Sequence, residues 1–323
     1  MTPGTCLVVM YHYVRDSAAT LFPGIRALAP TLFERQLDWL QAEHTPIDLG
    51  TLTAALDGRR ALPPRAALLT FDDGFIDHFE TVFPILRARG LSGTFFVAEH
   101  ACLGHDVLNV HKTHFLLAHL GADAFGREVQ AEGATLAESS RTAAVFGPDR
   151  WEHADERRIK QLLNYELSVA DATRVLDRLF QQHLGSSEAF ARDLYLQPEM
   201  IRDMAAGGMT FGYHTRSHRM LSRLPPAEQE DELRPGPAWI RALTGQTDVP
   251  FCYPWGGPET YTPDTVRLLA KLGYSVAFNT VRQRVDTASV RRYELPRLDT
   301  RDLPPHTSGE GAAAMAAAEG EGV

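Results

Sequence analysis

Short runs of apolar residues recur along the chain, and most are followed by polar residues and then by apolar residues spaced three or four positions apart. Short continuous apolar runs favour buried strands. Apolar residues three or four positions apart, as in 31–43 and 82–90, favour helices. Strands that alternate with helices are typical of an α/β fold with a mainly parallel sheet and helices outside it. The predicted strands are 6–13, 66–71, 93–98, 209–214, 249–254, 274–279 and 293–298.

The strand pattern disappears between residues 104 and 200, where good helix formers dominate and apolar residues recur at helical spacing. A crossover between parallel strands needs only about a dozen residues, so we interpret 104–200 as a mainly helical insertion. The two flanking regions, 1–103 and 201–303, then form one α/β domain. The last residues, 304–323, carry too little apolar bulk to pack and are predicted to be disordered.

The chain of 323 residues is long enough to bury a substantial core, and its apolar fraction of 44% is that of an ordinary globular protein. The net charge of −9 argues against a nucleic-acid partner, which calls for a basic surface. Part of this charge lies in an acidic run at 228–232, which is expected to form a solvated face. The widely spaced Cys6, Cys102 and Cys252 indicate reduced, mostly buried thiols rather than disulfides or a zinc–thiolate site.

The first residues, MTPGTCLVVMYHYV, lack the basic start and the long apolar core of a signal peptide. No stretch approaches the roughly 18 apolar residues of a membrane-spanning helix. We therefore expect a cytoplasmic protein without a membrane span. The sequence carries no indication of the oligomeric state.

The segment Thr70-Phe71-Asp72-Asp73-Gly74 ends one of the predicted strands. Neighbouring side chains of a straight strand point to opposite faces, so two adjacent aspartates can share one site only if the chain turns. The glycine that follows allows such a turn, and α/β folds bind their ligands at the carboxyl ends of their strands. A simple surface turn, which Asp-Asp-Gly also favours, is the alternative.

A second polar cluster, His214-Thr215-Arg216-Ser217-His218, follows another predicted strand. Two histidines four positions apart can bind one metal ion if the segment turns helically, although such a pair also arises by chance in a chain with 13 histidines. Two histidines and one aspartate would form a three-ligand site with open positions for water or substrate. The second aspartate is then free to act as a base, which suits metal-assisted hydrolysis.

Together with the YPWG sequence at 253–256, the TFDDG and HTRSH motifs resemble the polysaccharide deacetylase family, also known as carbohydrate esterase family 4 or the NodB-homology domain. The resemblance covers residues 5–103 and 201–303, with the motifs in the family's order. It implies a distorted (β/α) barrel of the NodB-homology type, interrupted here by the helical insertion. It also implies a metal-dependent hydrolase that removes an N-acetyl group from an amino sugar.

The resemblance implies a role for each matching residue. Asp72 would be the general base that activates water, and the metal, usually zinc, would be held by Asp73, His214 and His218. The metal would polarise the acetamide carbonyl and lower the pKa of its bound water.

The YPWG motif is expected to face the substrate and the oxyanion through Tyr253 and Trp255. The backbone N–H of Trp255 would help to hold the oxyanion, since Pro254 has no N–H to donate. The Trp255 ring offers a flat apolar wall for one face of a sugar, with simple burial in the core as the alternative.

The chain departs from the family pattern at two positions. Cys252 stands where many members carry an arginine that orients the catalytic aspartate, and Arg297 stands where many carry a histidine that supplies the general acid. Because a guanidinium stays charged near neutral pH, Arg297 is a poor proton donor. We expect it to take over the missing arginine's role by pairing with Asp72 or with the oxyanion. His12, which follows the first predicted strand, is the candidate acid unless it is a structural histidine.

The predicted function is therefore N-deacetylation of an amino sugar in an oligosaccharide, a nucleotide sugar or a lipid-linked glycan. Two alternatives stay open: a deformylase or amidase that acts on another amide, and a non-catalytic protein that binds a metal and a glycan. A non-haem iron oxygenase also uses two histidines and a carboxylate, but it would not need the second aspartate.

Overall fold

Residues 4–134 and 154–305 are described by the computed structural model, and they divide into two units. The first unit contains the described parts of Met1–Arg15, Ala27–Leu103 and Leu194–Val323, and the second contains Asp16–Arg26 and the described part of Gly104–Asp193. The second unit thus includes Asp16–Arg26, which precedes the predicted insertion in sequence. The tail that is predicted to be disordered lies outside the described residues from residue 306 onward.

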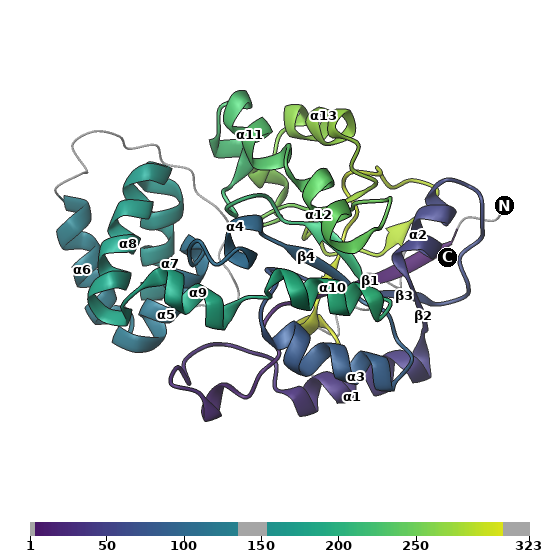
Figure 1. The fold of residues 1–323 in the computed structure, drawn as a ribbon, viewed down its shortest axis with the longest axis horizontal. Helices are drawn as coiled ribbons and strands as arrows, with labels where there is room; N and C mark the ends of the chain where they lie inside the picture. Colours follow the sequence, from purple (N-terminus) through teal and green to yellow (C-terminus); the bar gives the residue numbers. More distant parts are fainter. Residues whose placement is uncertain (1–3, 135–153, 306–323) are drawn as a thin grey trace. The chain divides into compact units, whose positions relative to one another are not determined.

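The first unit is built around a sheet (Figure 1). Six of its described strands overlap predicted apolar runs, whereas the strands at Thr45–Ile47 and Val285–Asp286 are not predicted, and the predicted strand 293–298 overlaps a strand only at Leu298. The strands are β1 (Thr5–Tyr11), β2 (Thr45–Ile47), β3 (Ala66–Phe71), β4 (Thr94–Val97), β5 (Thr210–Tyr213), β6 (Phe251–Cys252) and β7 (Ala277–Phe278). In the described part of the chain, the order runs β7-β6-β5-β4-β3-β1, and each neighbouring pair is parallel. The carboxyl ends of these strands therefore lie at one edge of the sheet.

Residues 295–299 join the two ends of this sheet. Leu295 forms a parallel bridge with Phe278 of β7, and β9 (Leu298–Asp299) pairs in parallel with β1. A further strand, β8 (Val285–Asp286), pairs antiparallel with the start of β1. The sheet curls back on itself in this way, and the predicted distorted (β/α) barrel is confirmed.

Strand side chains alternate between two apolar clusters. Val9 and Leu69 belong to an outer cluster that includes many helix residues, whereas Val8 and Leu68 belong to an inner cluster made largely of strand residues. The outer face carries a ladder of aromatic rings in register on β1, β3, β4 and β5. Its ring centroids lie 5.1, 4.6 and 5.6 Å apart in the order Tyr11, Phe71, Phe95, Phe211. The three cysteines are free and buried, as predicted.

Helices cover the outer face of the barrel (Figure 1). They are α1 (Pro30–Glu43), α3 (Phe83–Ala88), α4 (Glu99–Cys102), α10 (Pro198–Ala206), α11 (Pro226–Leu233), α12 (Gly236–Thr244) and α13 (Pro263–Leu272). Helix α2 (Leu49–Leu56) instead packs Leu49 and Leu52 into the inner cluster. Helices α1 and α3 run side by side (Figure 1), and Arg89 at the end of α3 donates to Asp38 of α1 at 2.5 Å. No helix among residues 4–134 and 154–305 is long and apolar enough to cross a membrane.

The second unit is helical, and its described part of Gly104–Asp193 lies within the predicted insertion 104–200. Its helices are α5 (Asn109–Leu120), α6 (Ala122–Ala134), α7 (Ala154–Gln161), α8 (Val169–Leu184) and α9 (Ser187–Leu194). Phe115 of α5 packs edge-on against Phe22 and Phe190, with ring centroids 4.9 and 4.8 Å apart. The Phe22 contact places the Asp16–Arg26 segment in this unit rather than with the barrel.

Candidate metal and catalytic site

The ends of the parallel strands carry the side chains that the motifs single out. The inner-face alternation of β1, β3 and β5 continues past the last residue of each strand, so that His12, Asp72 and His214 lie on the inner side. Asp72 is aligned with β1 by its backbone N–H, which donates to the carbonyl of Tyr11 at 2.9 Å. The sequence pattern thus brings three polar side chains from distant parts of the chain to one place.

Asp73 breaks the alternation because its backbone is left-handed, with φ +74°. This conformation lets the second carboxylate of the pair reach the site beside the first. Gly74 follows with φ +68°, and a Cβ there would lie 2.9 Å from Cγ1 of Val97. Glycine is therefore required at 74 both by the backbone conformation and by the close approach of β4.

Replacing Gly74 by alanine is expected to lower the free energy of unfolding by about 2–4 kcal/mol, the sum of a left-handed alanine and an overpacked contact. Gly90→Ala is the matched control, since Gly90 has φ +65° but no atom within 4 Å of the place that a Cβ would take. It should lose only the conformational part, about 1 kcal/mol. Urea unfolding in the presence of a chelator measures both variants, and equal losses would show that the Val97 contact costs nothing.

The donor atoms of Asp73, His214 and His218 converge. Nε2 of each histidine lies 3.4 Å from Oδ1 of Asp73, and the three atoms lie within 4.8 Å of one another. Nδ1 of His214 lies 2.8 Å from the carbonyl oxygen of Cys252. Since a carbonyl can only accept, Nδ1 carries a proton, and Nε2, which faces Asp73, is the ring atom that would bind a metal.

These separations suit a zinc ion. Ligand atoms about 2.1 Å from a tetrahedral zinc lie about 3.4 Å from one another, which is the separation of both histidines from Asp73. The hydrogen bond from Nδ1 of His214 to a backbone carbonyl is also the usual second contact of a metal-binding histidine. All three side chains are buried, with exposed fractions between 3% and 7%. The donor set therefore fits a divalent metal.

Backbone strain is concentrated at this site. Five non-glycine residues of the described chain have positive φ, and four of them belong to the motifs: Asp73, Thr215, His218 and Trp255. Such conformations cost about 1–3 kcal/mol each and persist only where the surrounding structure holds them. His218 is held in part by its N–H, which donates to Oγ1 of Thr215 at 2.8 Å.

Asp72 is paired with Arg297 inside the barrel. The guanidinium donates from Nη1 to Oδ1 at 2.8 Å and from Nη2 to Oδ2 at 2.7 Å, and both side chains are at most 3% exposed. It also donates to Oγ1 of Thr70 and to the carbonyl of Asn279. Burial alone would raise the pKa of Asp72, but the charge and hydrogen bonds of Arg297 outweigh it and lower the pKa to about 2.

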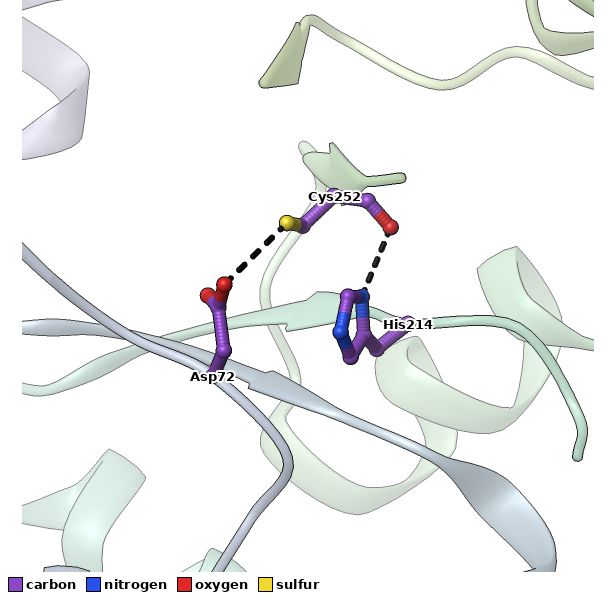
Figure 2. Close-up of side chains that lie close together, drawn as sticks. All are labelled: Asp72, His214 and Cys252. Atoms are coloured by element: carbon purple, nitrogen blue, oxygen red, sulfur yellow. Dashed lines mark hydrogen bonds between the residues drawn. The ribbon is translucent and has the colours of Figure 1, made fainter. Parts of the chain in front are cut away.

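Cys252 lies between the two motifs. Figure 2 shows its Sγ directed at the Asp72 carboxylate, 3.5 Å away, and its carbonyl oxygen directed at His214. A second potential metal-binding group is formed by these three residues. Two features disfavour it: Nη2 of Arg297 lies 3.0 Å from Sγ, and burial raises the pKa of the Cys252 thiol. We therefore favour the group made by Asp73 and the two histidines.

His12 lies at the open side of this cluster. Its Nε2 is 3.9 Å from Oδ2 of Asp72, and its side chain is 40% exposed. The backbone carbonyl of His12 accepts a hydrogen bond from Nε2 of the buried His78 at 3.0 Å. Among the predicted residues near Asp72, His12 is thus the one that solvent and a substrate can reach.

The YPWG motif contributes one core residue and one residue at the site. The Tyr253 side chain is buried, stacks on Tyr261 at a centroid distance of 3.8 Å, and donates to the carbonyl of Tyr293. Trp255 is half-buried with φ +67°, and its ring lies 6.0 Å from that of His218. The ring of Trp255, rather than that of Tyr253, is therefore next to the metal-binding group.

The expectation of a solvated acidic face is wrong for Glu232, which is 5% exposed. Its carboxylate accepts hydrogen bonds from the backbone and the hydroxyl of Ser217. The sequence feature that could have indicated this burial is helical spacing, since Gln229, Glu232 and Leu233 share one face of α11 and are all buried. A glutamate in an acidic run is usually solvated, so sequence reasoning passes over it.

The sequence profile of a family described as polysaccharide deacetylase matches residues 59–277. Poly-beta-1,6-N-acetyl-D-glucosamine N-deacetylase of Escherichia coli K12 is 34% identical over 84 residues, which are 25% of this chain and 12% of the E. coli protein. The chain thus matches only a small part of the length of that relative.

Solved structures with similar folds include the Streptococcus pyogenes deacetylase PplD in complex with acetate, with a TM-score of 0.58 and 18% identity. That comparison covers 97% of this chain and 98% of the other. IcaB from Ammonifex degensii has a TM-score of 0.54 and 19% identity, over 97% and 96% of the two chains. At these identities the likeness concerns the fold.

Proposed function

Since the chain belongs to the polysaccharide deacetylase family, we propose that it is a metal-dependent hydrolase that removes an N-acetyl group from an amino sugar. The observation that carries the proposal is the pairing of two functions in one buried cluster. Asp73, His214 and His218 offer three metal-binding atoms within 4.8 Å, and the neighbouring carboxylate of Asp72 is held apart from them by Arg297. This arrangement supports hydrolysis in which one aspartate binds metal and the other moves a proton.

Asp73, His214 and His218 would hold the metal, and the mixed nitrogen and oxygen donors favour zinc. When bound, the metal supplies Lewis acidity that polarises the acetamide carbonyl and lowers the pKa of a water molecule. Nδ1 of His214 donates its proton in a hydrogen bond to the Cys252 carbonyl, which leaves Nε2 as the atom that would bind the metal.

Asp72 acts as the general base. Its pKa of about 2 keeps the carboxylate ionised at neutral pH, and the two hydrogen bonds from Arg297 fix the plane of the carboxylate. It accepts a proton from the attacking water. The hydrogen bonds that orient the carboxylate also lower its basicity, although a general base is most effective when its pKa lies near the working pH. Arg297 is thus a positioning residue, and it fills the role of the arginine missing at Cys252.

The YPWG segment shapes the substrate side. The backbone N–H of Trp255 contributes to holding the oxyanion, and its ring forms a wall for one face of the sugar. Tyr253 anchors the segment from the core through its stacking on Tyr261 and its hydrogen bond to Tyr293. The substrate class is an amino sugar within an oligosaccharide, a nucleotide sugar or a lipid-linked glycan.

His12 is assigned as the general acid that protonates the leaving amine. Replacing His12 by alanine is expected to lower kcat about 10²–10⁴-fold and to leave thermal stability almost unchanged, because the side chain is 40% exposed. Turnover is measured with and without added imidazole, which should restore part of the rate if the lost group is a proton donor. Full turnover of the variant without imidazole would remove His12 from the mechanism.

Acetate release from a panel of N-acetylated sugars, nucleotide sugars and short oligosaccharides tests the function. We expect release that is abolished by a chelator and restored by zinc. Formate release, or release of acetate only from non-sugar amides, would instead support the deformylase or amidase. A protein that binds zinc and glycan but hydrolyses nothing would be a non-catalytic binding protein.

A further inference from the structure

The segment between the two histidines of the proposed metal site, residues 214–218, is here named the metal loop. It contains two left-handed residues, Thr215 at φ +65° and His218 at φ +58°. At about 1–3 kcal/mol each, this strain would relax unless other parts of the chain tie the loop down. One side of the loop is tied by α4, where the backbone N–H of His100 donates to the carbonyl of Arg216 at 2.9 Å.

The opposite side of the loop is tied by one residue, Glu232. Its backbone carbonyl accepts the N–H of Arg216 at 3.1 Å. Its carboxylate accepts the N–H of Ser217 at 2.8 Å through Oε2 and the hydroxyl of Ser217 at 2.5 Å through Oε1. Consecutive residues of the metal loop are thus fixed by a single side chain and its own backbone.

The position of Glu232 in the helix is unfavourable for the stability of the helix itself. The residue lies in the last turn of α11 (Pro226–Leu233), where the helix dipole opposes a negative charge. Burial to 5% exposure adds a desolvation cost. Nη1 of Arg219 lies 3.9 Å from Oε1, beyond hydrogen-bond distance. The hydrogen bonds to Ser217 are therefore the main compensation, so helix and loop depend on each other through this carboxylate.

We propose that Glu232 is a positioning residue that pre-organises the metal loop for the metal, an inference that rests on the proposed function. Without its carboxylate, the ties on Ser217 are lost and the strain at His218 can relax. Nε2 of His218 would then leave its place 3.4 Å from Oδ1 of Asp73. The consequence is a weaker metal site in a protein that is still folded.

The test measures zinc affinity by competition with a chromophoric chelator. Glu232→Ala should weaken zinc binding about 10–100-fold, the usual effect of removing a residue that orients metal ligands. Glu232→Gln should recover most of the affinity, because its amide can accept from the N–H of Ser217 and donate to the hydroxyl. Glu228→Ala is the matched control on the same helix, where Glu228 pairs with Arg219 at a half-exposed position, and it should bind zinc like wild type.

Two further measurements separate positioning from simple destabilisation. The rise in Tm on adding zinc is measured for wild type and for Glu232→Ala, each relative to its own metal-free protein. This rise should be smaller for Glu232→Ala, whatever the change in the Tm of the metal-free variant. Ser217→Ala should weaken zinc binding by itself, and the double variant should bind zinc no more weakly than Glu232→Ala, because Ser217→Ala removes only the hydroxyl hydrogen bond, which Glu232→Ala removes as well. If Glu232→Ala does not fold, Ser217→Ala carries the test.

The outcomes distinguish this inference from the proposed function. A wild-type protein that binds no zinc would overturn the metal site and the inference together. A wild-type protein that binds zinc, with Glu232→Ala and Ser217→Ala binding equally tightly, would overturn the inference and leave the metal site standing. Additive losses in the double variant would also overturn it, since they would mean that the two residues act separately.

Discussion

Replacing Arg297 by methionine is expected to lower the free energy of unfolding by about 3–5 kcal/mol, because the change leaves the Asp72 carboxylate buried without its partner. The pair is among the most buried of the described ion pairs, with side-chain exposures of 0% and 3%. Arg297→Lys keeps the charge but cannot reproduce two parallel hydrogen bonds to Asp72. It should therefore lose less stability and still lose most of the turnover. Urea unfolding in a chelator, and acetate release below the unfolding transition, measure the two effects.

The control is Arg202→Met, which removes a surface ion pair with Glu199 at side-chain exposures of 51% and 76%. Exposed pairs contribute only about 0–1 kcal/mol, so this variant should unfold almost like wild type. A double variant, Arg297→Met with Asp72→Asn, removes both charges and should recover part of the lost stability. An Arg297→Met protein as stable as wild type would mean that water reaches Asp72 and that the pair is not dry.

The motifs on the strands could be predicted from the sequence because a strand constrains the side chains that follow it. The apolar runs locate the strands, and the period of two places His12, Asp72 and His214 on the inner side. Parallel pairing then brings them to one edge. For the motifs on the strands, local pattern and topology thus determine the arrangement together. The expectation that Arg297 pairs with Asp72 or with the oxyanion comes instead from the family resemblance, because the chain lacks the family's arginine at Cys252, and the structure shows the contact with Asp72.

Other features depend on tertiary contacts that no local pattern carries. The left-handed backbones of Thr215 and His218 are imposed by ties from α4 and from Glu232. Glu232 lies fifteen residues beyond Ser217 in the chain, within a charged run whose ordinary place is the surface. The Asp16–Arg26 segment belongs to the helical unit because Phe22 packs on Phe115 there. The pattern of hydrophobic residues does not indicate that a polar residue is buried, or that a loop packs in a different unit from its neighbours in sequence.

Strain and burial at this site point to the same physical role. The motif residues adopt left-handed backbones, and the charged pair behind them is fully desolvated. Both features are unfavourable for stability alone. They are consistent with a site whose ligand atoms and base are fixed before substrate binds, so that little reorganisation is needed during the reaction.

Asp72→Asn is expected to lower the rate of acetate release about 10²–10⁴-fold while zinc affinity stays within a few-fold of wild type. The amide keeps the shape of the side chain and one acceptor for Arg297, but it cannot take a proton from water. Asp73→Asn should have the complementary effect and weaken zinc binding, because it replaces a ligand carboxylate. Activity is compared at saturating zinc, and affinity is measured by chelator competition.

The comparison of these two variants also decides between the two potential metal-binding groups around His214. If Asp72→Asn loses zinc and Asp73→Asn keeps it, the metal is held by Asp72, His214 and Cys252, and the assignment of base and ligand must be exchanged. Asp48→Asn serves as a control for the chemical change, since Asp48 caps α2 by accepting the N–H of Thr51 at 2.7 Å. Because asparagine caps a helix about as well as aspartate, it should lose only the charge at the helix N-terminus, about 0.3–1 kcal/mol of stability, and no activity. Unchanged acetate release from Asp72→Asn would show that the base is another group.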